Sequence, residues 1–457
     1  MRAQTGRSLG PILIVAALAL GAAPAMAEPL AAALARTYRG NPQLSAERAR
    51  QRADDENVPT ALSGYRPTIV GQAQAGPRYE RSRPGGGDDL VTPLTLGLTL
   101  DQMLYDSGRT AATVRGAESG VFGGRATLRG VEQTVLLMAV TAYMNVLRDE
   151  QLVTLQLGNI EALTETLRIA RKRFELGDSR RTDSAQAEGR LARGQADLAV
   201  ARSNLQASVS AYRQVIGAPP QDLAFPKPPE GLLPRSLAAG SAKTRAEHPA
   251  VRSAIHAVDG AEHGVKLAEA DLGPEARLQG SLQRNIGRKL PSDETPLYTL
   301  GVQATVPVYD GGVAAAAVRR AKETVGQRRM DLEAARIAVV ADLRTAWANL
   351  EAARAAVPAA EAAIAANEIA VAGVRAEALE GQRTTIEVLN AQQELLGARS
   401  SLVVARRDLV VASYGTLSAA GMLTARRLGL AGRHYRPETH YDQVRDLKSG
   451  LQTPDGR

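Results

Sequence analysis

The side chains best suited to chemistry in this sequence are its histidines, of which there are five. His256 and His263 stand seven residues apart, which places both on one face of a helix, but no third metal ligand lies nearby. The sequence contains no cysteine, no GxSxG elbow, no HExxH pair and no P-loop. We therefore predict no catalytic residue, no metal site and no cofactor, and we interpret the protein as a non-enzyme.

Charged residues at two expected helix starts are the remaining candidates. Glu387 and Asn390 are three residues apart and so share a helix face, with Arg383 shortly before them. Asp183 also stands where a helix is expected to begin. Because the helix dipole favours a negative charge at such a position, these carboxylates could serve the helix alone.

The chain that carries these residues repeats itself. Tyr105-Asp106-Ser107-Gly108 returns 204 residues later as Tyr309-Asp310-Gly311-Gly312, and Gly177 returns as Gly381 with the same offset. One ungapped offset held over most of a half-chain indicates a tandem duplication. We predict structural repeats at 28–217 and 244–423, with a Pro-rich linker at 218–243 and a partly disordered tail at 424–457.

Each repeat is predicted to contain one long β-hairpin, at 65–106 and at 275–310. In the first, leucines at every second position from Leu94 to Leu100 alternate with Thr and Gly, a period typical of a strand with one apolar face. Four strands cannot close a barrel, and an open sheet with an apolar face would aggregate. Either helices cover the sheet or several chains pool their strands.

Long helices are predicted after the hairpins, at 107–176 and 311–380, each about 100 Å in length. Return helices at 183–217 and 384–421 carry apolar residues every seven positions, which predicts antiparallel coiled-coil packing. A shorter helical stretch opens each repeat. Pro358 lies inside the second long helix and predicts a kink or break there.

The repeated motif falls where the strand period changes to the helical period. Its aspartates suit the cap of the following helix, and its glycines relax a tight corner. The predicted junction residues are Tyr105, Asp106, Gly108, Tyr309, Asp310 and Gly312. The motif alone indicates a geometric role with no chemistry.

Residues 1–27 have the pattern of a secretion signal, with an apolar run from Ile12 to Ala22 and a cleavage site at Ala25-Met26-Ala27. The formal net charge is +8, but aromatic residues make up only 3% of the chain and do not alternate with the basic ones. We therefore predict no nucleic-acid partner.

Several segments, taken together and in order, are similar to those of one known family. They are Asn41-Pro42, the two Tyr-Asp-x-Gly corners, Thr141 to Val146, Arg173-Phe174-Glu175-Leu176-Gly177, and Val306 to Gly312. With the duplication and the signal, the chain resembles the TolC family of outer-membrane efflux and secretion channels from about Glu28 to Leu423.

This resemblance implies a mainly α-helical homotrimer in the outer membrane of a Gram-negative cell. Three chains would pool their strands in one 12-stranded barrel in contact with outer-membrane lipid, and the helices would form a tunnel in the periplasm. The partners would be a periplasmic adaptor and an inner-membrane pump of the ABC or RND type. Because it has no cysteine to carry a lipid, the chain resembles the non-lipidated, type I secretion-like branch of the family. The cargo could be proteins or small molecules.

The same resemblance implies a gate at the far helical tips. Arg383, Glu387 and Asn390 resemble its second-half segment, although Asn390 stands where a second acid is expected, and Thr182-Asp183 resembles the partner of Arg383. Three Glu387 carboxylates would then form a ring that favours cations. Gly177 and Gly381 would form the tip turns, near which the adaptor docks. A soluble periplasmic coiled-coil or adaptor-like protein is the alternative, and the duplicated hairpins speak against it.

Overall fold

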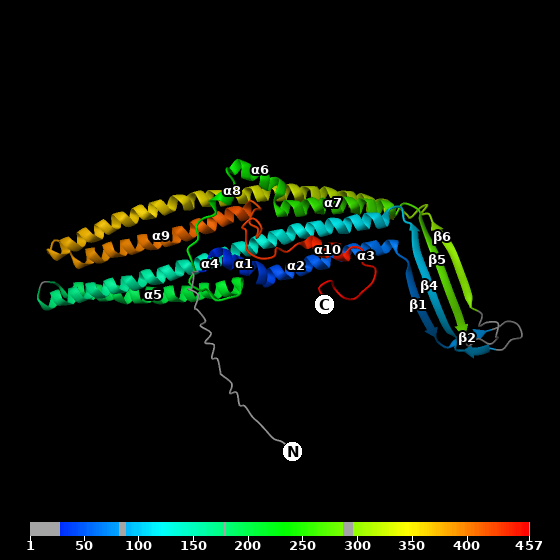
Figure 1. Ribbon diagram of the computed structural model, residues 1–457, viewed down its shortest axis with the longest axis horizontal. Coiled ribbons are helices and arrows are strands. Elements are labelled where there is room, and N and C mark those ends of the chain that lie inside the picture. The colour runs from blue at the N-terminus through cyan, green and yellow to red at the C-terminus, as the bar shows by residue number, and fades with distance from the viewer. Residues whose placement is uncertain (1–27, 82–87, 178, 287–295, 457) are drawn as a thin grey trace, which may run out of the picture.

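The computed structural model describes residues 28–81, 88–177, 179–286 and 296–456. The predicted secretion signal therefore lies outside the described residues. Long helices form an elongated body, and a β-sheet projects from one end of it (Figure 1).

The elements, in chain order, are α1 Leu30–Gly40, α2 Pro42–Asp55, α3 Asn57–Leu62, the 3₁₀ helix η1 Ser63–Tyr65, β1 Thr68–Ala75, β2 Arg78–Arg81, β3 Asp88–Val91, β4 Leu94–Tyr105, α4 Arg109–Glu175, α5 Arg181–Ile216, η2 Glu230–Leu232, α6 Leu237–Glu247, α7 Pro249–Ala270, β5 Glu275–Ile286, β6 Leu297–Thr305, α8 Val313–Leu379, α9 Thr385–Ala419 and α10 Pro437–Val444.

The two longest helices, α4 and α8, have 67 residues each, or about 100 Å at 1.5 Å per residue. A helix this long needs lateral packing, because propensity alone gives little stability. The return helices supply it on the distal halves, where α5 packs on α4 and α9 packs on α8. On the halves nearer the sheet, α1, α2 and α3 pack on α4, while α7 packs on both α4 and α8.

The main sheet has four antiparallel strands in the order β1-β4-β5-β6. Residues directly opposite one another in an antiparallel pair share a face. One row across the sheet is Gly71, Leu98, Leu282 and Tyr298, and the next on the same face is Ile69, Leu100, Gly280 and Leu300. The alternate row on the other face is Val70, Thr99, Ser281 and Thr299.

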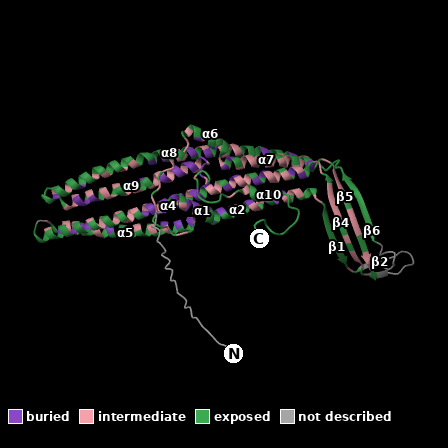
Figure 2. Ribbon diagram, in the orientation of Figure 1, coloured by how far each residue is buried: buried purple, intermediate pink, exposed green. Residues whose placement is uncertain are grey.

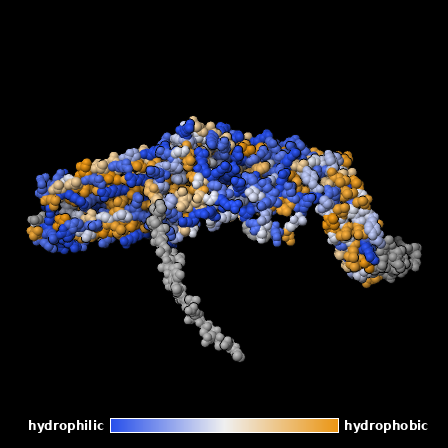
Figure 3. All heavy atoms as spheres, viewed as in Figure 1, coloured by the Kyte–Doolittle hydropathy of each residue, from blue (hydrophilic) through white to orange (hydrophobic). Residues whose placement is uncertain are grey.

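The sheet thus has an apolar face, and this face is exposed in the single chain. Ile69, Tyr298 and Leu300 are each at least 70% exposed. Orange surface covers much of the sheet in Figure 3, whereas the helical body is mostly blue with scattered orange. The edge strands β1 and β6 each pair on one side only within the described residues.

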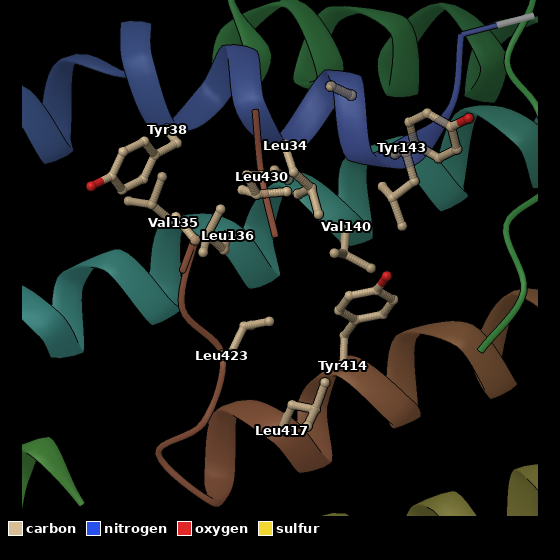
Figure 4. Packing of buried hydrophobic residues seen from close by; sticks show 14 of the residues in the cluster. Leu34, Tyr38, Val135, Leu136, Val140, Tyr143, Tyr414, Leu417, Leu423 and Leu430 are labelled. Atoms are coloured by element: carbon tan, nitrogen blue, oxygen red, sulfur yellow. The ribbon is translucent and has the colours of Figure 1, made fainter. Parts of the chain in front are cut away.

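The main hydrophobic core lies in the middle of the helical body, where buried residues concentrate (Figure 2). Leu34 of α1, Leu136 and Val140 of α4, and Leu417 of α9 meet there, and the C-terminal segment adds Leu430 (Figure 4). The core therefore joins the two repeats.

Three expectations from the sequence need correction. The tail was expected to be partly disordered, but it contains α10, which packs on α2. The sequence predicted a kink or break at Pro358, and the break is wrong because α8 is continuous there. The proline is exposed, so water can solvate the carbonyl group that loses its helical hydrogen-bond partner. The first hairpin also carries an extra two-stranded sheet, β2-β3, beyond its two long strands.

Candidate functional site: the helical tips and the corners

Each helical hairpin turns at its tip through a glycine with left-handed backbone conformation. Gly177 has φ +84° and Gly381 has φ +78°. A Cβ built on either glycine would meet nothing within 4 Å, so the backbone conformation and not space is the constraint. After α8, the Gly381 N–H donates to Ala378 O at 3.3 Å and the Gln382 N–H donates to Glu377 O at 2.9 Å. These bonds end the helix by satisfying its last carbonyl groups.

Glu387 closes a capping box at the start of α9. Its Oε2 accepts from the Thr384 backbone N–H at 2.8 Å and from Thr384 Oγ1 at 2.9 Å. Its Oε1 accepts from Arg383 Nη1 at 2.8 Å, and Arg383 Nε also donates to Glu377 Oε2 at 2.7 Å. The Glu387 carboxylate is therefore bound by residues of its own turn. This supports the interpretation that it stabilises the start of the helix.

These bonds fix the charge of the tip. Hydrogen bonds lower the pKa of Glu387 to about 2. The largest effect comes from the Thr384 backbone N–H, and the Arg383 guanidinium and the Thr384 hydroxyl contribute less. The hydrogen bonds that Arg383 donates to Glu377 and Glu387 raise the pKa of Arg383 above its ordinary value. At the tip of the second hairpin one arginine thus stands between two carboxylates, so this group of three side chains carries a net negative charge at neutral pH.

The structure does not join Arg383 to its expected partners. Within the described residues, Arg383 pairs with Glu377 and Glu387, and neither Thr182 nor Asp183 is among its hydrogen-bond or ion-pair partners. Asn390 instead accepts a hydrogen bond from Arg190 of α5 at 2.8 Å. Whether Glu387 lines a pore depends on the trimer, and that role stays a prediction.

Two arginines that the sequence analysis did not single out as site residues join the two helical hairpins near their tips. Arg173 of α4 donates through Nη2 to Ala378 O at 2.9 Å and Leu379 O at 3.3 Å, at the C-terminal end of α8. Arg190 is the second, through its bond to Asn390. Arg173 belongs to a segment already noted for its resemblance, but no spacing rule indicates a partner some 200 residues away.

A small apolar cluster supports these polar links. Leu163, Leu167, Ala170 and Ala187 of the first hairpin pack with Leu389 of the second. Beside it, a cleft of about 500 Å³ opens between α4 and the α8-α9 turn, with Arg173 in its wall.

The sheet-to-helix corners are built alike in both repeats. Asp106 accepts from the Gly108 N–H at 3.1 Å and the Thr110 N–H at 2.7 Å. Asp310 accepts from the Gly312 N–H at 2.8 Å and the Ala314 N–H at 2.6 Å. Both glycines have positive φ, +87° and +90°.

These contacts set the charge state of the corners. Partial burial would raise the pKa of Asp106, but hydrogen bonds from Thr110 and Gly108 outweigh it and lower the value overall. Hydrogen bonds from Ala314 and Gly312 lower the pKa of Asp310. Tyr105 and Tyr309 are 56% and 88% exposed, so neither is a core residue in the single chain.

Among the described residues, no group of three or more His, Cys, Asp or Glu side chains could hold a metal ion. His256 is paired with Asp259 at 3.2 Å, and His440 with Asp55 at 3.0 Å. The geometry offers turns, caps and charged links, which are means of positioning helices.

Comparison with known proteins gives a consistent result. The family model described as "Outer membrane efflux protein" matches residues 33–218 and 241–421. The chain is 39% identical over 437 residues to Outer membrane efflux protein BepC of Brucella suis, covering 95% of this chain and 94% of that protein. It is 26% identical over 346 residues to Outer membrane protein TolC of Vibrio cholerae, covering 74% and 78%.

The fold is also similar to solved structures. The Campylobacter jejuni CmeC outer membrane channel superposes with a TM-score of 0.77 at 16% identity, over 91% of this chain and 89% of that one. At that identity the likeness concerns the fold alone.

Proposed function

The chain belongs to the outer membrane efflux protein family, and from this premise we propose that it is the exit duct of a tripartite export system. Family membership confirms three expectations from the sequence: the protein is a TolC-family channel, it resides in the outer membrane with its helices in the periplasm, and it is not an enzyme. The fold expectation, long helical hairpins with four strands in one sheet, is confirmed as well.

The observation that carries the proposal is the exposed apolar face of an open four-stranded sheet at the end of a helical body about 100 Å long. Such a sheet is stable where lipid covers the apolar face and neighbouring strands cover the edges. Three chains supply twelve strands, which is enough to close a barrel. The polar rows, including Thr99 and Ser281, then face the lumen.

The long helices also call for neighbouring chains. Both α4 and α8 contain a stretch apolar enough to cross a membrane, but the stretch in α4 is 56% buried and that in α8 only 6%. In a periplasmic tunnel, contacts with the next protomer would bury this surface of α8. TolC-like relatives act as trimers with adaptors and inner-membrane pumps.

We place adaptor docking near Gly177 and Gly381, beside the 500 Å³ cleft between the hairpins. Opening of the tip would separate the hairpins and break the links made by Arg173 and Arg190. The pump, of the ABC or RND type, would supply the energy. Because BepC is named an efflux protein, we propose small-molecule efflux ahead of protein secretion.

Planar-bilayer recording of the purified full-length protein tests the proposal. We expect discrete conductance steps from a detergent-stable trimer. A monodisperse protein that never inserts, and that stays in the aqueous fraction on phase separation, would indicate the soluble adaptor-like alternative. For cargo, cells without the protein should accumulate a fluorescent dye; normal dye efflux together with loss of a secreted protein would favour secretion.

A further inference from the structure

A basic cleft lies between α2 and the C-terminal segment, away from both the tips and the sheet. Its volume is about 920 Å³. Five arginines line the cleft, whereas Asp455 supplies the single carboxylate in its lining. We call it the arginine cleft. Its arginines are Arg39, Arg48, Arg52, Arg433 and Arg436. Within the described part of the chain, none of the five forms an ion pair, although arginines elsewhere commonly do.

One arginine of the cleft, Arg48, is held in a fixed geometry. The Arg48 guanidinium carbon lies 4.5 Å from the centre of the Tyr38 ring and 5.4 Å from that of Tyr435. Arg48 Nη2 also donates to Tyr38 O at 2.9 Å. An arginine placed between two rings loses little freedom when it binds an anion, since its planar fork is already oriented.

The walls of the cleft are fastened to each other. The Tyr435 N–H donates to Tyr38 Oη at 3.0 Å, which ties the C-terminal segment to α1. His440 of α10 contacts Asp55 of α2 at 3.0 Å. The buried carboxylate of Asp55 is thereby engaged with His440 and Gln51, and among the described residues it forms no ion pair with the five arginines.

Converging guanidinium groups are suited to oxyanions, because each presents N–H donors that match two oxygens of a carboxylate or phosphate. We propose that the arginine cleft binds a water-soluble polyanion that carries phosphate or carboxylate groups. Asp455 also lines the cleft and accepts a hydrogen bond from Thr453 Oγ1, and its negative charge opposes the binding of an anion there.

The position of the cleft favours a soluble ligand over a lipid headgroup. Arg48 and Arg52 precede the end of α3 at Leu62 by 10 to 14 residues, and the sheet follows directly. At 1.5 Å per helical residue, the cleft lies about 15–20 Å from the sheet. A headgroup layer is only about 5–8 Å thick, so it does not reach the cleft.

Titration calorimetry of the purified full-length trimer in detergent, with inorganic tripolyphosphate and with citrate as probes, tests the proposal. The double variant Arg433→Ala/Arg436→Ala removes two exposed charges, so its fold should be unaffected. We expect its affinity to fall about tenfold or more, and affinity to weaken with added salt. The matched control Arg193→Ala/Arg235→Ala removes two exposed arginines elsewhere and should bind like the wild type. Equal effects of both pairs, or no binding at about 10 mM probe, would overturn the proposal.

Asp455→Asn provides an independent check, because it removes the negative charge that lines the cleft without altering the arginines. We expect binding to tighten about threefold to tenfold, and an unchanged affinity would contradict the repulsion between Asp455 and the bound anion. A parallel experiment measures binding of the protein and its arginine variants to phosphatidylglycerol vesicles. Arginine-dependent binding to vesicles, without binding of the soluble probes, would replace the soluble ligand with a lipid headgroup. None of these variants touches the tips, so conductance should remain that of the wild type.

Discussion

Removing the guanidinium of Arg173 should make the closed tip less stable. Its two hydrogen bonds, at 2.9 and 3.3 Å, hold the C-terminal carbonyl groups of α8 against α4. A hydrogen bond to a charged group contributes about 1.5–3 kcal/mol when well shielded. Because Arg173 is only half-buried and its second bond is long, we take about 1–2 kcal/mol for the pair.

That free energy corresponds to a factor of about 5–30 in the ratio of open to closed tips. Single-channel recording of Arg173→Ala in planar bilayers should therefore show an open probability higher by about this factor, with unchanged conductance of the open state. Arg171→Ala is the matched control, since Arg171 lies on the same helix but contacts Glu188 of its own hairpin, at 3.4 Å. An open probability equal to that of the wild type, or an equal rise in both variants, would refute the gate role of Arg173.

Three further outcomes are expected. Gly381→Val forces a β-branched residue into a left-handed backbone conformation, which costs about 1–2 kcal/mol. Dye efflux should therefore fall, while native gels show an intact trimer. Gly381→Asn should retain more efflux, because asparagine tolerates this conformation better. Because the pKa of Glu387 is lowered from 4.5 to about 2, its stabilisation of the tip is complete above the unfolded value and lost as pH falls toward 2. Amide exchange near Thr384 should thus be protected equally at pH 5 to 8, and a midpoint near pH 6 would contradict the assignment. Tyr143 Oη lies 2.6 Å from both Glu28 O and Ala224 O inside the core, so Tyr143→Phe should lower the free energy of unfolding by about 1–3 kcal/mol in urea titration, whereas Tyr309→Phe at an exposed corner should not.

Much of the arrangement could be predicted because it depends on contacts within a few residues. The alternation around Leu98 predicts a strand with one apolar face, and the register places Leu282 and Tyr298 on that same face. The motif at Asp106 predicts a helix cap, and the carboxylate accepts from N–H groups two and four residues ahead. The two tip glycines follow the same logic of backbone conformation.

The gate role of Arg383, Thr182 and Asp183 stays a prediction, and the contacts within the single chain are local ones. The sequence pointed to Arg383 with Thr182 and Asp183, whereas Arg383 bonds to residues of its own turn. Side chains of that length can reach several acceptors, and the nearest carboxylates, Glu377 and Glu387, are four to six residues away in sequence. Local partners of this kind compete with the longer-range contact that the resemblance suggested.

The sequence by itself determined the duplication, the hairpins, the long helices and their turns, and through them the family. These features follow from periodicity and from glycine and aspartate at fixed offsets, which act over one or two turns of chain. Only the tertiary structure decided which side chains meet across the repeats. Arg173 finds the end of α8, and the C-terminal segment folds back on α2 to form the arginine cleft. Such contacts join residues about 200 to 400 positions apart, and they depend on how the helices pack rather than on any local pattern.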